Sequence, residues 1–246
     1  MYGPRSRTRG EVVVMTTAPT QEPPAPDPEA RGLRLVVVLL SLTVVSGLID
    51  AVSYLGFGRV FTANMTGNVV VLGFAAAGAP GFSVPHTATS LGCFLLGAVT
   101  GGRLAAHVGN GSRRRWTRLT LAAEAALVGL SAAVAFAWPH ATGTIYALIA
   151  FTGYAMGLRN ATVRKLGIAD LTTTTVLTMT LTGLAADSRL GDATSHRSPR
   201  RTAAVIAMFA GACLGAWLVL HHSLGIPLLI AALTSGVLAV AASGRE

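Results

Sequence analysis

One carboxylate and a short polar run after it are the residues of this sequence that could bind a charged ligand. Asp50 lies inside an apolar stretch that begins near residue 35, roughly 22 Å along a helix at 1.5 Å per residue. An ionisable side chain at that depth in a membrane is costly, so it is a functional candidate by default. The alternative is a packing role, in which Asp50 accepts hydrogen bonds from neighbours or pairs with Arg59.

Two polar stripes lie in the two shortest apolar stretches. Asn64 and Asn68 are one helical turn apart and flank Thr66. The second stripe, at i, i+4 spacing, comprises Thr174, Thr178 and Thr182. Because amides at apolar depth need partners, we expect the asparagines to face the threonines. Threonine can also bond to its own i−4 carbonyl with no function at all, so a purely structural stripe stays open.

The candidate site would take a proton, a cation or a small solute, with Asp50 as the carrier. It comprises Asp50, Asn64, Thr66, Asn68, Asn160, Thr178 and Thr182. Glu124, nearer a cluster of arginines at 113–115, favours an interfacial ion pair instead. The histidines lack ligand spacing, and the nucleotide and nucleophile motifs are missing, so we expect no metal, no cofactor and no enzyme.

The composition places these residues in a membrane protein. Of 246 residues, 52% are hydrophobic and only 12% are charged, whereas soluble domains carry about 25% charged residues. The net charge of +9 comes from short clusters between apolar runs, which is typical of loops beside a membrane and does not favour nucleic acid. The lipid bilayer is therefore the expected partner, and a homo-oligomer is left open.

Six stretches are long enough to cross a bilayer, and two shorter ones decide the topology. The six are residues 35–57, 88–108, 119–138, 141–158, 203–220 and 224–242, and the short ones are 62–78 and 172–186. If both short stretches return to the side they entered from, eighteen of the nineteen basic residues share one side and only Arg59 lies opposite. The positive-inside rule then predicts six spans, two re-entrant segments and both termini in the cytoplasm.

The two halves of the chain resemble each other. Residues 47–51 and 157–161 both start with Gly-Leu, each precedes a short Thr-Gly segment, and each is followed by a helix rich in small residues. Three spans per half is an odd number, so the second half must be inverted, as in many transporters. Chance similarity among Ala, Gly and Leu helices is the alternative.

We expect a disordered tail at 1–32, with Met1 or Met15 as the start, and membrane repeats at 33–138 and 139–246.

Two motifs also carry a resemblance to a known family. Residues 46–55 and 60–70, with the acid, the amides and Thr-Gly in fixed order, resemble the signature of the YoaK family of bacterial inner-membrane proteins. Residues 157–161 and 175–183 resemble its second block, although Arg159 stands where a Gln is expected in many relatives. The resemblance runs from about residue 33 to 242 and implies a multi-spanning membrane protein.

The sequence as a whole predicts an all-α membrane bundle acting as a small-solute or ion transporter of the bacterial inner membrane. A membrane scaffold or sensor, in which the same polar residues lock the halves together, is the alternative.

Overall fold

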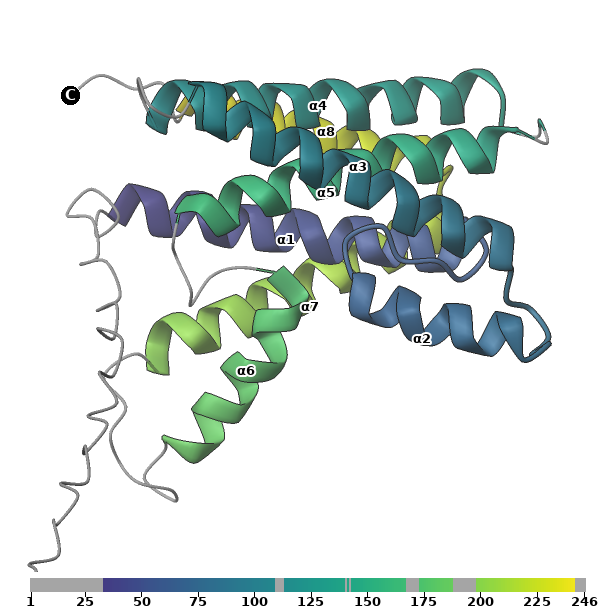
Figure 1. Ribbon diagram of the computed structural model, residues 1–246, viewed down its shortest axis with the longest axis horizontal. Helices are drawn as coiled ribbons and strands as arrows, with labels where there is room; N and C mark the ends of the chain where they lie inside the picture. The colour runs from purple at the N-terminus through teal and green to yellow at the C-terminus, as the bar shows by residue number, and fades with distance from the viewer. Residues whose placement is uncertain are drawn as a thin grey trace, which may run out of the picture.

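The structure, a computed structural model, describes residues 33–108, 113–139, 141, 143–166, 173–187 and 198–241. These residues form eight α-helices and, within this described part, no strand (Figure 1). The expected tail at 1–32 lies outside it. The chain is thus an all-α, polytopic membrane bundle, as predicted.

Six long helices lie nearly along one axis (Figure 1). They are α1 (Leu33–Gly56), α3 (Val84–Val108), α4 (Arg113–Ala137), α5 (Thr144–Leu166), α7 (Ser198–His221) and α8 (Gly225–Ala241). Four of them, α1, α3, α4 and α7, contain stretches long and apolar enough to cross a membrane. The sequence predicted six such spans, but α8 has only 17 residues, and Arg159 and Asn160 lower the hydropathy of α5. Both nevertheless pack among the other four helices.

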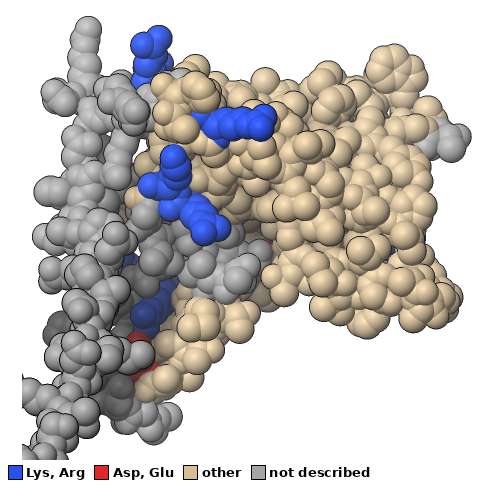
Figure 2. Space-filling view, viewed as in Figure 1, with Lys and Arg blue, Asp and Glu red and all other residues tan. Residues whose placement is uncertain are grey.

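Charge marks one end of this bundle. Lys and Arg side chains gather at the end where α1, α4 and α7 begin (Figure 2). The exposed basic residues there include Arg118, Arg164, Lys165 and Arg200, and we call this the basic end. Arg59, which follows α1 at the opposite end, lies over the ring of Phe82, with its guanidinium carbon 5.5 Å from the ring centre.

Two short helices lie on one side of the long ones. The helix α2 (Met65–Ala76) packs against α3, and α6 (Thr173–Ala186) packs against α7 (Figure 1). With 12 and 14 residues, they are about 18 and 21 Å long, which is too short to cross the hydrocarbon core. Their bounds agree with the short stretches that the sequence indicated.

Glycines bring the long helices together in two pairs, α1 with α7 and α3 with α5. A Cβ atom on Gly47 would meet the backbone of Met208 and Ala212 in α7. A Cβ atom on Gly157 would likewise meet the backbone of Phe94 and Ala98 in α3. Only glycine allows such close backbone approach between membrane helices.

The second helix of each pair also contributes a glycine that contacts the backbone of the first. A Cβ on Gly211 would meet the carbonyl of Val44, and one on Gly97 would meet the carbonyl of Tyr154. A single offset in residue number relates Gly47 to Gly157 and Val44 to Tyr154, and another relates Gly97 to Gly211. At the crossing of α4 and α8, a Cβ atom on Gly129 would lie 3.8 Å from the Cβ of Ala232, and one on Gly236 would lie 3.8 Å from the Cβ of Ala125. A third offset thus relates Gly129 to Gly236 and Ala125 to Ala232.

Candidate functional site

Asp50 lies six residues before the end of α1 and is 5% exposed. Its Oδ1 accepts hydrogen bonds from the backbone N–H groups of Ala63, at 3.0 Å, and Asn64, at 3.2 Å. Its Oδ2 is buried and has no hydrogen-bond partner among the described atoms. One oxygen of the carboxylate therefore has hydrogen-bond partners, and the other has none in the described structure.

The segment 57–64 reaches Asp50 because the chain reverses sharply after α1. Gly58, at φ +86°, and Arg59, at φ +61°, adopt left-handed conformations, and the first of these favours glycine. The N–H of Arg59 donates to the carbonyl of Tyr54 at 3.1 Å, which closes the turn. The chain then runs back to the depth of Asp50, and α2 carries it outwards again.

Asn68 and Asn64 hold this segment in place. Asn68 is fully buried; its Oδ1 accepts from the N–H of Phe61 at 2.9 Å and its Nδ2 donates to the Phe61 carbonyl at 2.6 Å. Ser90 of α3 accepts from Asn68 at 3.1 Å and donates to the same carbonyl at 2.6 Å. Asn64 caps α2, because its Oδ1 accepts from the N–H of Gly67 at 3.1 Å. Both amides thus find local partners.

The predicted seam between asparagines and threonines is not formed by the described residues. Asn68 bonds within its own segment and to α3, while Thr178 and Thr182 are exposed on α6, where Thr182 donates to the Thr178 carbonyl at 2.9 Å. The side chain of Thr174 lies outside the described residues. Thr66 is also exposed. Thr182 therefore bonds back within its own helix, as the structural alternative expected.

Asn160 is the candidate of the second half that lies inside the long helices. It is half-buried on α5, next to Arg159, and its Oδ1 is buried without a hydrogen-bond partner in the described structure. Among the candidate residues, Asp50 and Asn160 are thus the two with an unoccupied buried oxygen.

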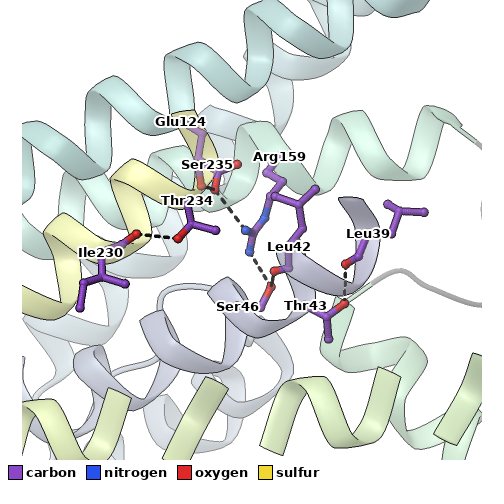
Figure 3. Close-up of polar contacts among 9 residues, drawn as sticks. All are labelled: Leu39, Leu42, Thr43, Ser46, Glu124, Arg159, Ile230, Thr234 and Ser235. Carbon is purple, nitrogen blue, oxygen red and sulfur yellow. Dashed lines mark hydrogen bonds and ion pairs between the residues drawn. The ribbon is translucent and has the colours of Figure 1, made fainter. Parts of the chain in front are cut away.

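An ion pair that the sequence did not predict lies deeper in the bundle (Figure 3). Arg159, 2% exposed, donates from Nη1 to Oε1 of Glu124, which is fully buried, across 3.1 Å. Its Nη2 donates to Ser46 at 2.5 Å, and Ser235 donates to Glu124 Oε1 at 2.8 Å. Four helices, α1, α4, α5 and α8, therefore meet in one polar network.

This network corrects the expectation for Glu124, which pairs with Arg159 and not with the arginine-rich loop. Asp50 follows the other form of its packing alternative, because it accepts hydrogen bonds from the neighbouring 57–64 segment and not from Arg59. The predicted span ended at residue 158, which left Arg159 outside the bundle, whereas α5 continues to Leu166. The sequence did hold a signal for this ion pair. Glu124 and Arg159 carry opposite charges and lie at similar depth in two helices predicted to be consecutive in the chain.

The fold and the network define a polytopic α-helical membrane protein with charged residues buried at its centre. The chain belongs to the family described as protein of unknown function DUF1275, whose model matches residues 38–241. This confirms the resemblance that the two motifs indicated.

A curated relative supports the same class. The chain is 34% identical over 153 residues to the UPF0700 transmembrane protein YoaK of Bacillus subtilis (strain 168). The matched region covers 61% of this chain and 65% of the relative, so it spans somewhat under two thirds of that protein. No solved structure matches the chain.

Proposed function

We propose that this protein is a transporter of a small solute or ion, and that Asp50 carries the proton or cation that drives or accompanies transport. The observation that carries the proposal is the state of this carboxylate, which is 5% exposed and has one bonded and one unpartnered oxygen. A group that served packing alone would be expected to have all its polar atoms satisfied. Asn160, with its own unpartnered oxygen, is the second member of the site.

The helix arrangement supports the proposal. The paired glycine contacts of α1 with α7 and α3 with α5, related by constant offsets, favour two inverted halves. In that arrangement α2 and α6 are equivalent half-crossing segments, as is typical of transporters that bind their substrate between two repeats. Thr178 and Thr182 would then lie along the route by which the solute reaches the binding site, and not in the site itself, because both are exposed on α6.

Charge distribution supports an orientation. The basic end would face the cytoplasm of a bacterial cell, with both termini on that side of its plasma membrane, because basic residues are retained there. Arg59, Asp50 and the segment 57–64 would then lie toward the outer side.

A scaffold or sensor is the second candidate function, and a specific observation favours it. The hydrogen bonds from Arg159 to Glu124 and Ser46 join helices of both halves, as expected of a static lock between them. A lock of this kind would need no movement of Asp50 or of the segment that it holds.

Reconstituted vesicles distinguish the two functions. The purified protein would be placed in liposomes with an internal pH dye under an imposed proton gradient, with potassium and valinomycin setting the potential. Separate liposomes without the ionophore would carry an internal sodium- or potassium-sensitive dye under a gradient of that ion. A transporter with an ion carrier dissipates at least one gradient faster than empty liposomes, and Asp50→Asn abolishes the difference. A wild-type protein that leaves every gradient unchanged contradicts ion movement and favours the scaffold.

Asp187→Asn is the matched control. It makes the same carboxylate-to-amide change at the end of α6, where Asp187 pairs with Arg201 at 2.5 Å and is 31% exposed. The proposal expects this variant to retain the wild-type flux.

A further inference from the structure

We infer that Asp50, Glu124 and Arg159 form one site that binds a single additional monovalent positive charge, either a proton or an alkali cation. The inference rests on the proposed function for its role in transport. It adds Glu124 and Arg159 to the site, and it states how many positive charges the site binds.

Direct contacts join Glu124, Arg159 and Ser46, and Asp50 lies one helical turn from Ser46. Ser46 and Asp50 are one turn apart on α1, and Ser46 accepts from Nη2 of Arg159 at 2.5 Å. Nη1 of the same guanidinium donates to Glu124 at 3.1 Å. Arg159 therefore bonds directly to one carboxylate and, through Ser46, lies one turn of α1 away from the other.

The charges of this cluster do not balance. Two carboxylates and one guanidinium leave one negative charge in excess, and these are the only charged side chains among the buried residues that the structure describes. An unmatched charge inside hydrocarbon is strongly disfavoured, so the cluster should be neutral when the protein is folded in a bilayer. One proton or one alkali cation supplies the missing charge.

Among the described residues no other titratable side chain is buried, so none of them supplies it. Tyr54 follows Asp50 by one turn and stacks on Phe61, and α8 presents the neutral Ser235. His86 of α3 lies against Gly58 near the end of the bundle, and the described arginines of α7, Arg200 and Arg201, lie at the basic end.

Unpartnered oxygens give the additional charge a place to bind. Oδ2 of Asp50, Oε2 of Glu124 and Oγ1 of Thr62 are all buried without a hydrogen-bond partner in the described structure. The residues that carry them are 5%, 0% and 0% exposed. Carboxylate and hydroxyl oxygens are the ligands that hard cations prefer, and a carboxylate oxygen is also where a proton would reside.

The fold does not itself require this cluster. The offsets that relate the glycine contacts map Glu124, Arg159, Ser46 and Ser235 onto Ala231, Ile49, Met156 and Val128. All four counterparts are apolar and fully buried. The equivalent place in the bundle is thus filled by ordinary hydrophobic packing, which is evidence that the charges serve a ligand.

Two measurements on the purified, detergent-solubilised full chain test the inference. Infrared spectra in sodium- and potassium-free choline buffer at pH 8 would detect a protonated carboxyl group through its C=O stretch. Thermal unfolding would then be followed while sodium or potassium chloride replaces choline chloride at constant ionic strength. We expect either one protonated carboxyl per protein or a one-site, saturable rise of Tm with an alkali cation.

Asp50→Asn and Glu124→Gln each remove the excess negative charge and leave one ion pair. Both variants should lose the carboxyl band and the cation dependence, whereas Asp187→Asn should retain them. Arg159→Gln leaves two negative charges, so it should double the band intensity or bind cations more tightly. Should Asp50→Asn fail to fold, Glu124→Gln supplies the same test.

Absence of both signatures in the wild-type protein overturns the inference, as does their persistence in both charge-removing variants. Binding is measured here without transport. A protein that shows the signature but moves no ion in vesicles contradicts the proposed function alone, and one that moves ions without either signature contradicts this inference alone.

Discussion

Asp50 and Ala63 are thirteen residues apart in the chain and are joined by a buried hydrogen bond of 3.0 Å from the Ala63 N–H to the carboxylate. Asn64 adds a second bond to the same oxygen at 3.2 Å. This contact determines how deeply the chain returns into the bundle after α1. It also connects the ionisation of Asp50 to the position of the 57–64 segment.

Replacement of Asp50 separates its structural role from its charge. Asp50→Asn keeps an oxygen that accepts both N–H groups, so we expect a folded protein with a Tm near the wild-type value and no ion movement. Asp50→Leu leaves two buried donors unsatisfied and should lose about 1–3 kcal/mol for each. Thermal unfolding in detergent measures the difference. Equal stability of the Leu and Asn variants would contradict the anchoring role.

Substitution of Gly97 tests the close approach of α3 and α5. In Gly97→Ala the new Cβ meets the Tyr154 carbonyl, a backbone atom that cannot move independently, so we expect a loss of about 1–3 kcal/mol. The matched control is Gly92→Ala on the same helix, where no atom lies within 4 Å of the new Cβ. It should be neutral or slightly stabilising, because alanine favours a helix. Equal unfolding temperatures for the two variants would be incompatible with the contact.

The buried ion pair predicts a coupled pair of substitutions. Arg159→Met alone leaves Glu124 without its direct partner and should destabilise the protein by about 3–5 kcal/mol, whereas Glu124→Leu alone leaves Arg159 balanced by Asp50 and should cost less. The double variant should lose less than the sum of the two, with a coupling of about 0.5–3 kcal/mol. Ser46 tolerates the loss of the Arg159 guanidinium in the double variant, because its hydroxyl also donates to the Leu42 carbonyl at 3.1 Å. A double-mutant cycle of unfolding free energies makes the measurement, and strictly additive effects would refute the coupling.

The proposed orientation predicts where reporter fusions will be active. Reporters after Arg115, Ser195 and Glu246 should indicate the cytoplasm, because all three positions belong to the side that carries eighteen of the nineteen basic residues. A reporter after Trp138, at the far end of α4, should indicate the outside. Ser195 and Glu246 lie outside the described residues, so the fusions also test that part of the chain. An external signal at Arg115 would reject this orientation.

The helices could be predicted from the sequence because their length and composition reflect the thickness of hydrocarbon that they cross. The short lengths of α2 and α6 followed from the lengths of their apolar stretches, and the basic residues gather on one side only if those segments do not cross. Which helix packs against which could not be predicted, because a motif of small residues permits close approach without specifying the neighbouring helix. Gly97 and Gly101 of α3, for example, permit a close contact, but nothing in their spacing specifies that it is with α5.

The candidate site was predicted less well, for physical reasons. Asp50 was identified from its depth, but Asn68 was expected to need a distant partner, whereas it is satisfied by the backbone of Phe61, seven residues away. Arg159 was missed because a buried arginine is favourable only beside a specific carboxylate. That carboxylate, Glu124, is thirty-five residues away in the chain.

The exchange of partners between the halves has a consequence for biogenesis. Because α1 packs on α7 and α5 packs on α3, the first half cannot bury its glycine surfaces until the second half has been synthesised. During translation α1 would wait in the bilayer, with the Gly47 surface facing lipid, while some 150 further residues are inserted, as the two-stage view of membrane assembly allows. Insertase or chaperone contacts with that surface would be transient and would end when α7 arrives.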